Sequence, residues 1–117
     1  MTALTVALTI SVSAAAAAPQ ARWQLGKPLP EPRSEVAAAV YQGRIVLVGG
    51  FEIDRTTSKR VDVYLPGRKR WRRLPDHPRV VNHSTAAAAK NRVFALGGGP
   101  DPDLSVSAAN EILDLSC

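Results

Sequence analysis

The side chains best suited to chemistry in this 117-residue chain are its two histidines and the polar groups around one of them. His77 and His83 are six residues apart, and no Cys, Asp or Glu stands between them to complete a metal site. His83 follows Asn82, and Glu35 holds the position that corresponds to His83 in an earlier, similar segment. Arg33 lies two residues before that glutamate. Whether these side chains act together depends on the elements that position them.

A period of 48 residues recurs along most of the chain. Residues 32–50 read PRSEVAAAVYQGRIVLVGG, and residues 80–98 read VVNHSTAAAAKNRVFALGG, so that the diglycine at the end of one segment aligns with that of the other. Trp23 and Trp71 are separated by the same number of residues as the two diglycines. VDVYLP at 61–66 is weakly similar to NEILDL at 110–115, and the offset between these two segments is one residue longer. A fixed period of this length predicts a repeat fold.

One repeat is predicted to hold four strands. It runs as strand, turn, strand ending in Gly-Gly, long loop, strand, turn, and a strand that carries tryptophan. The alanine-rich segment 36–41 favours a helix by propensity alone. It is only six residues long, lies between a proline and a Gln-Gly turn, and is followed by a β-branched run, so we predict a strand. We expect antiparallel sheets over 36–74 and 84–115.

The sequence resembles the kelch repeat family over residues 23–115. The resemblance is carried by residues at matching positions: Arg33, Gly43, Ile45, Gly49, Gly50, Val63, Tyr64 and Trp71. It departs from the family at Leu65, where an acid usually follows the tyrosine, and at Val80, where an arginine is expected in the second unit. The resemblance implies an all-β, kelch-type β-propeller with blades of four antiparallel strands.

The predicted propeller is incomplete, because 117 residues supply only about two blades. We assign 1–21 to a leader, 22–35 to an outer closing strand with a Pro-rich connector, 36–74 to the first kelch unit and 75–117 to an incomplete second unit. The remaining blades are expected in a longer protein. The structural motif comprises Gly49, Gly50, Tyr64, Trp71, Gly97 and Gly98.

In a propeller the segments that precede the inner strands converge on one mouth of the central channel. The resemblance therefore implies a polar ligand-binding pocket formed by Arg33, Glu35, Asn82 and His83. Glu35 and His83 are its candidate catalytic groups, since both can transfer protons. The alternative hypothesis is that Arg33 and His83 brace loops between blades.

The N-terminal segment resembles a secretory signal peptide. Residues 1–18 are uncharged and apolar, and Ala15 and Ala17 supply an A-x-A pattern, although no basic residue precedes the apolar run. This predicts a secreted or periplasmic protein with no membrane span. The single cysteine, Cys117, excludes an internal disulfide framework, and its own role is left open.

The formal net charge of +5 is concentrated in GRKRWRR at 67–73. Such a cluster can meet nucleic acid, an anionic glycan or a membrane, but basic residues around one buried tryptophan also solvate an outer strand. We favour the second interpretation and expect no nucleic-acid partner.

Two function classes follow from the resemblance. The first is a secreted or periplasmic kelch scaffold that binds a protein or a glycan through its blade loops, without enzyme activity. The second is a sugar-active enzyme on the same fold, similar to a sialic acid mutarotase-like isomerase or, with less support, to a galactose oxidase-like enzyme. We expect no cofactor and no metal site.

Overall fold

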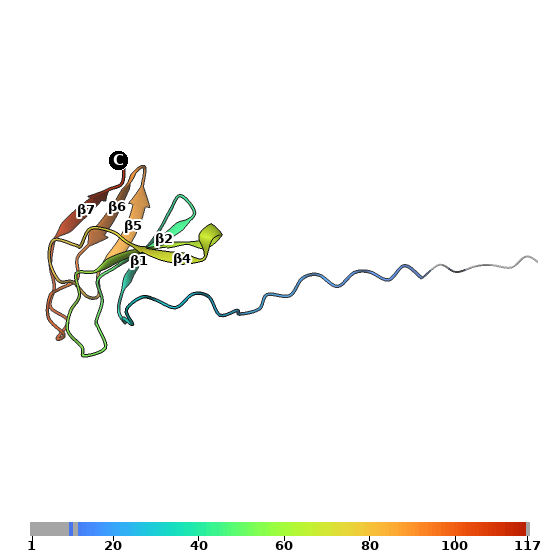
Figure 1. Cartoon of the computed structure of the whole chain (residues 1–117), viewed down its shortest axis with the longest axis horizontal. Helices are drawn as coiled ribbons and strands as arrows, with labels where there is room; N and C mark the ends of the chain where they lie inside the picture. The colour runs from blue at the N-terminus through green and yellow to red at the C-terminus, as the bar shows by residue number, and fades with distance from the viewer. Residues whose placement is uncertain (1–9, 11, 117) are drawn as a thin grey trace, which may run out of the picture.

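The computed structural model describes residue 10 and residues 12–116. Its strands form two antiparallel sheets, in the orders β1-β2-β3-β4 and β5-β6-β7, which confirms the predicted all-β fold (Figure 1). The strands are β1 (Ala37–Tyr41), β2 (Arg44–Val48), β3 (Val61–Leu65), β4 (Arg70–Arg73), β5 (Thr85–Ala89), β6 (Arg92–Leu96) and β7 (Asn110–Asp114). A short 3-10 turn (Pro66–Arg68) joins β3 to β4.

The alanine-rich segments are strands because their turns and their alternating burial suit a hairpin. Gln42 and Gly43 connect β1 to β2 with φ of 48° and 70°, and positive φ at both central residues is what a type I′ turn requires. Within β1 the side chains of Ala37, Ala39 and Tyr41 are buried while the intervening residues are exposed. Small side chains therefore face the neighbouring sheet, as expected for an inner strand.

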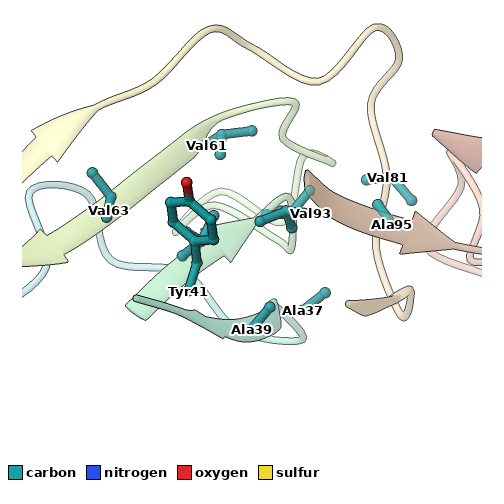
Figure 2. Packing of buried hydrophobic residues seen from close by; sticks show 10 residues of the cluster. Ala37, Ala39, Tyr41, Val61, Val63, Val81, Val93 and Ala95 are labelled. Atoms are coloured by element: carbon teal, nitrogen blue, oxygen red, sulfur yellow. The ribbon is translucent and has the colours of Figure 1, made fainter. Parts of the chain in front are cut away.

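The core lies between the two sheets. The first sheet contributes Val46, Val61 and Val63, and the second contributes Val93 and Ala95 (Figure 2). Val81, in the connector between the sheets, is fully buried against both. Burial of β2 is less complete than its apolar sequence predicts, because Arg44 and Ile45 at its start are exposed.

Tyr64 and Trp71 pack together at the outer edge of the first sheet. They are cross-strand partners on β3 and β4, and their ring centroids are 4.9 Å apart. The indole Nε1 of Trp71 donates a hydrogen bond of 3.0 Å to the carbonyl of Lys27. This contact attaches the start of the connector to β4.

The diglycines end β2 and β6 where the backbone lies against the segment leading into an inner strand. Gly50 and Gly98 have φ of 96° and 70°. A Cβ at Gly50 would overlap the carbonyl oxygen of Ser34, and a Cβ at Gly98 would overlap that of Asn82. Ser34 and Asn82 hold equivalent positions in the two repeats, so each glycine performs the same role in its own repeat.

The N-terminal segment leaves the sheets as an extended tail (Figure 1). Trp23 and Leu25 are fully exposed and form no strand. The blade that they are predicted to complete is not among the described residues, so the closing-strand assignment stays a prediction. The predicted leader falls partly on residues 1–9 and 11, and Cys117 also lies outside the described residues. The part that is described contains no helix long and apolar enough to cross a membrane.

Candidate functional site

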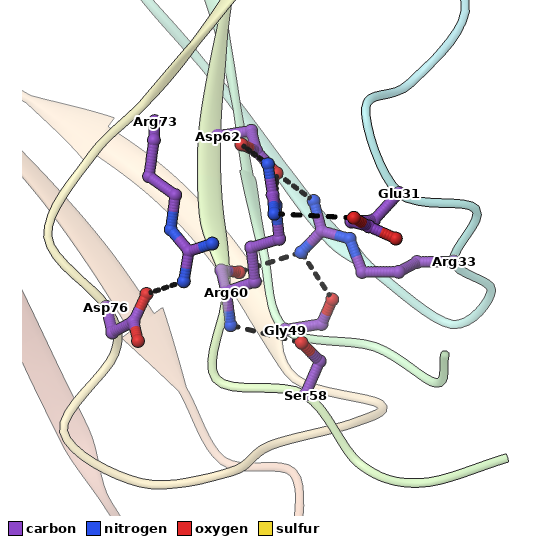
Figure 3. Close-up of polar contacts among 8 residues, drawn as sticks. All are labelled: Glu31, Arg33, Gly49, Ser58, Arg60, Asp62, Arg73 and Asp76. Atoms are coloured by element: carbon purple, nitrogen blue, oxygen red, sulfur yellow. Dashed lines mark hydrogen bonds and ion pairs between the residues drawn. The ribbon is translucent and has the colours of Figure 1, made fainter. Parts of the chain in front are cut away.

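Arg33 is held inside the first sheet. Its side chain has no exposed surface; Nη1 donates to the carbonyls of Gly49 (3.1 Å) and Arg60 (2.8 Å), and Nη2 donates to Asp62 (2.6 Å) (Figure 3). Arg60 also binds Asp62 at 2.8 Å. Burial lowers the pKa of Arg33, and the neighbouring Asp62 carboxylate opposes that shift. These contacts all lie within the first repeat, so Arg33 braces its own repeat. Its role in ligand binding and its role in bracing loops between blades both stay predictions.

Arg79 occupies the equivalent place in the second sheet. It donates to the carbonyl of Gly97 (2.9 Å) and to both carboxylate oxygens of Glu111 (2.5 and 3.3 Å). The hydrogen bond from Arg79 holds the pKa of Glu111 below its ordinary value of 4.5. The second unit therefore does have an arginine, Arg79, which lies one position before Val80 and two before Val81, the residue 48 positions after Arg33.

The sequence reasoning missed Arg79 and the two acids because their spacings drift from the repeat period. Arg79 follows Arg33 two positions too early for that period, and Glu111 follows Asp62 one position too late. The signal that identifies them is their order rather than their spacing. Each repeat places an arginine, a diglycine and an acid in succession.

His77 belongs to the joint between the sheets rather than to a site with His83. It is buried, its backbone N–H donates to the Lys59 carbonyl (2.8 Å), and its Nδ1 lies 2.8 Å from the Arg79 carbonyl. Its Nε2 lies 3.5 Å from Glu111. Among the residues that the structure describes, no three His, Cys, Asp or Glu side chains gather to hold a metal ion.

The loops of the two repeats line a cavity of about 630 Å³ that is open to solvent. Arg33, Glu35 and His83 contribute to its walls, but the Arg33 side chain is fully buried, so of these three only the Glu35 and His83 side chains are exposed there. The remaining walls come from the loop after β2, including Phe51 and Ile53, and from the loop after β6.

Glu35 and His83 lie side by side on the wall of this cavity. His83 Nε2 lies 3.3 Å from a carboxylate oxygen of Glu35, and its ring packs edge-on against Phe51, with centroids 5.7 Å apart. Both residues have left-handed backbones, with φ of 52° and 53°, a conformation that costs energy for residues other than glycine. The same strained backbone at the same repeat position brings the two side chains together.

Asn82 lies behind the cavity and positions its neighbours. It is 1 % exposed, and its Nδ2 donates to Thr57 Oγ1 (3.1 Å) and to the Asp101 carbonyl (3.0 Å). Its Oδ1 lies 2.6 Å from His83 Nδ1. Asn82 thus joins both loops and orients the histidine.

The rim of the cavity combines carboxylates with exposed apolar side chains. Ile53 is 86 % exposed and Leu104 is 64 % exposed, and both line the cavity. Among the exposed side chains of the inner-strand approach and the two loops, acids outnumber Lys and Arg: Glu35, Glu52, Asp54, Asp101 and Asp103 against Arg55 and Lys59. Of these, Glu35, Glu52 and Arg55 line the cavity. The rim is therefore suited to a ligand with both basic and apolar groups.

Comparison with known proteins gives one family and several relatives. The family model described as "Kelch motif" matches residues 32–78. Alpha-scruin of Limulus polyphemus is 30 % identical over 93 residues, which are 74 % of this chain and 10 % of that protein. Kelch-like protein 36 of Mus musculus is 40 % identical over 61 residues, 51 % of this chain and 10 % of its own length.

A third relative, Kelch repeat protein M-T8 of Myxoma virus, is 32 % identical over 76 residues, 65 % of this chain and 15 % of its own length. The chain therefore spans 10 to 15 % of the length of these three curated relatives.

Proposed function

We infer that this chain, which belongs to the kelch-repeat family, binds a protein partner through the loop-bearing face of two successive propeller blades. The observation that carries this proposal is the cavity of about 630 Å³ at the junction of the two repeats. Loops on a rigid repeat scaffold commonly carry its binding residues. The cavity is lined by loops of both repeats, so a partner would contact the two blades together.

The chemistry of the rim supports an extended peptide segment as the bound element. Ile53 and Leu104 offer exposed apolar surface at the cavity, and apolar anchors surrounded by polar residues are typical of protein interfaces. The excess of carboxylates favours a partner segment that carries lysine or arginine. The bound segment is therefore a basic one with apolar anchors.

Selection from a displayed peptide library, followed by calorimetry, tests this proposal. Selected peptides are expected to be basic, and the double variant Ile53→Asp/Leu104→Asp should weaken their binding by at least about tenfold through loss of apolar anchors. Because an added carboxylate attracts a basic peptide, the same test is made with Ile53→Ser/Leu104→Ser, which removes the apolar anchors without changing the charge. The matched control is Val106→Ser, in the same loop as Leu104 but outside the cavity lining. Unchanged binding by the double variant, or equal loss in the control, would overturn the site.

A second candidate is sugar binding with acid–base chemistry, as in a mutarotase-like isomerase. It is favoured by the 3.3 Å approach of Glu35 and His83 inside the cavity. Saturation-transfer NMR against neutral and acidic sugars, with measurement of anomer exchange, tests it. The chain should accelerate exchange of a sugar that it binds, and Glu35→Gln should remove that acceleration. Absence of bound sugar would leave protein binding as the function.

We also propose that the protein is exported. The support is the uncharged apolar sequence of residues 1–18 with its Ala15 and Ala17 pattern. Expression followed by N-terminal sequencing should give a product outside the cytoplasm that begins near Ala18 or Ala21. A cytoplasmic product that retains Met1 would contradict export.

A further inference from the structure

The hairpin turns lie at the opposite ends of the strands from the loops, and they are strongly basic. Because neighbouring strands are antiparallel, the turns at 42–43 and 66–69 share one end of the first sheet, and the turn at 90–91 lies at the same end because Asn91 lines one hollow with Gln42 and Arg72. We name this end the turn face. Its exposed basic residues are Arg44, Arg68, Lys69, Arg70, Arg72, Lys90 and Arg92.

Apart from Arg92, none of these cations forms an ion pair within the described part of the chain. The ion pairs of the first sheet involve Arg33, Arg60 and Arg73, which lie toward the loops. Asp114, at the end of β7, is already bound by Arg92 at 3.1 Å. The turn face therefore retains its positive charge.

The turn face is also hollowed. Two hollows of about 360 Å³ each share three wall residues, Gln42, Arg44 and Arg72. One hollow is completed by the second sheet, including Asn91, and the other is completed by the turn that carries Arg68. The two hollows therefore meet at a shared wall.

Strand register explains why Arg44 and Arg72 flank the same groove. Arg72 is paired with Val63 on β3, and Val63 is paired with Val46 on β2. Arg44 precedes Val46 by two residues, so it lies on the same face of the sheet. The two arginines thus extend from the sheet face that meets the second repeat.

We propose that Arg44, Arg68 and Arg72 form a groove that binds a sulfated polysaccharide. The planar guanidinium matches the oxygens of a tetrahedral oxyanion with paired donors, which supports three arginines as sulfate ligands. The amides of Gln42 and Asn91 line the same hollows and can bind sugar hydroxyls. Two adjoining hollows with arginines on their walls suit a linear polyanion.

The lining disfavours single-stranded nucleic acid as the occupant. Proteins that bind single strands stack bases on exposed aromatic side chains. Tyr41 is the one aromatic residue in the described lining of the two hollows, and it is only 6 % exposed. Recognition here depends on charge and hydrogen bonds alone, as sulfate and hydroxyl groups require.

Surface plasmon resonance on immobilised heparin tests the groove. The chain should bind heparin and should not bind desulfated heparin. The triple variant Arg44→Gln/Arg68→Gln/Arg72→Gln should weaken heparin binding by at least about tenfold, since three charge-assisted contacts are lost. The matched control Arg22→Gln/Arg55→Gln/Lys59→Gln removes the same charge elsewhere and should change affinity by less than about twofold.

A second variant separates geometry from charge and guards against misfolding. Arg44→Lys/Arg72→Lys keeps the charge but removes the planar fork, and it should weaken binding by about threefold. Circular dichroism should show unchanged strand content in each variant.

Equal loss of heparin binding in the triple variant and its control would overturn the groove, because simple net charge would then explain the binding. Binding of oligo-dT or of phosphatidylserine vesicles as tight as that of heparin would also overturn it, in favour of nucleic acid or a membrane surface. The peptide site at Ile53 and Leu104 should be unaffected by the turn-face variants, so the two proposals fail independently.

Discussion

Each repeat uses one arginine to hold its own diglycine bend to the strand that follows. Arg33 binds the Gly49 carbonyl and Asp62, and Arg79 binds the Gly97 carbonyl and Glu111. A buried carboxylate without its cation is costly, so these pairs are most visible when one partner is removed. We therefore expect the contacts of Arg33 to contribute to the stability of its repeat.

Replacing Arg33 by alanine should lower the free energy of unfolding by about 3 kcal/mol, because Asp62 stays buried with one cation fewer. Arg55→Ala, at an exposed loop position, should change it by less than about 0.5 kcal/mol. Urea denaturation followed by tryptophan fluorescence measures both. A neutral effect of Arg33→Ala, combined with loss of peptide binding, would instead assign Arg33 to the ligand.

Acid should weaken the second brace. Arg79 lowers the pKa of Glu111 below its unfolded value of about 4.5, so this ion pair contributes stability above that pH. The contribution should disappear as pH falls from about 4.5 through the lower folded pKa. Unfolding free energies of the wild type and Glu111→Gln should therefore converge in acid. A constant difference between the two curves would exclude the linkage.

At the scale of elements, the connector between the sheets joins the two repeats. The Gly50 N–H donates to the Val81 carbonyl (2.8 Å), and the Val81 N–H donates to the Ser58 carbonyl (3.0 Å). The His83 N–H donates to the Glu35 carbonyl (3.3 Å), so the two cavity residues are linked through the backbone as well. The diglycines make these close approaches possible.

Gly50→Ala and Gly98→Ala should each lower stability by about 1 to 3 kcal/mol, because φ is positive and the new Cβ would overlap a carbonyl oxygen. Gly67→Ala is the matched control, since its Cβ would meet no atom within 4 Å and its φ is not positive. Thermal melts of the three variants measure the difference. Equal melting temperatures would show that the diglycine bends are not under steric constraint.

The elements were more predictable from sequence than the side-chain contacts. The repeat period, the Gly-Gly signals and the short alanine runs predicted both sheets, since strand patterning and turns are local properties. The cavity shared by Glu35 and His83 was predicted only through the family resemblance. Arg79 was missed because insertions and deletions in loops change the number of residues between equivalent side chains of the two repeats. The turn-face groove needed strand register, which a single sequence does not supply.

At the scale of the whole molecule, the outer faces of both sheets are uncovered in the described chain. Val40 on β1 is 70 % exposed, and Ile112 on β7 is 52 % exposed. These faces and the free edges of the outer strands are open to other apolar surfaces. In a propeller, neighbouring blades cover such faces.

The isolated chain should therefore bind a hydrophobic dye and self-associate as its concentration rises. Dye fluorescence and analytical ultracentrifugation measure this behaviour. Val40→Lys/Ile112→Lys should reduce both signals, because each change places a charge on an uncovered face. A monodisperse wild-type monomer with a sharp melt and no dye binding would contradict the two-blade architecture.

Hydrogen–deuterium exchange with and without a selected basic peptide tests the central claim of loop-face binding most directly. The peptide should slow exchange in the cavity loops, at residues 51–57 and 99–105. Exchange in the turn at 66–69 and in strands β1 and β7, whose outer faces are uncovered, should be unchanged. Slowed exchange confined to the turn or to those two strands, with the cavity loops unaffected, would contradict protein binding at the loop face.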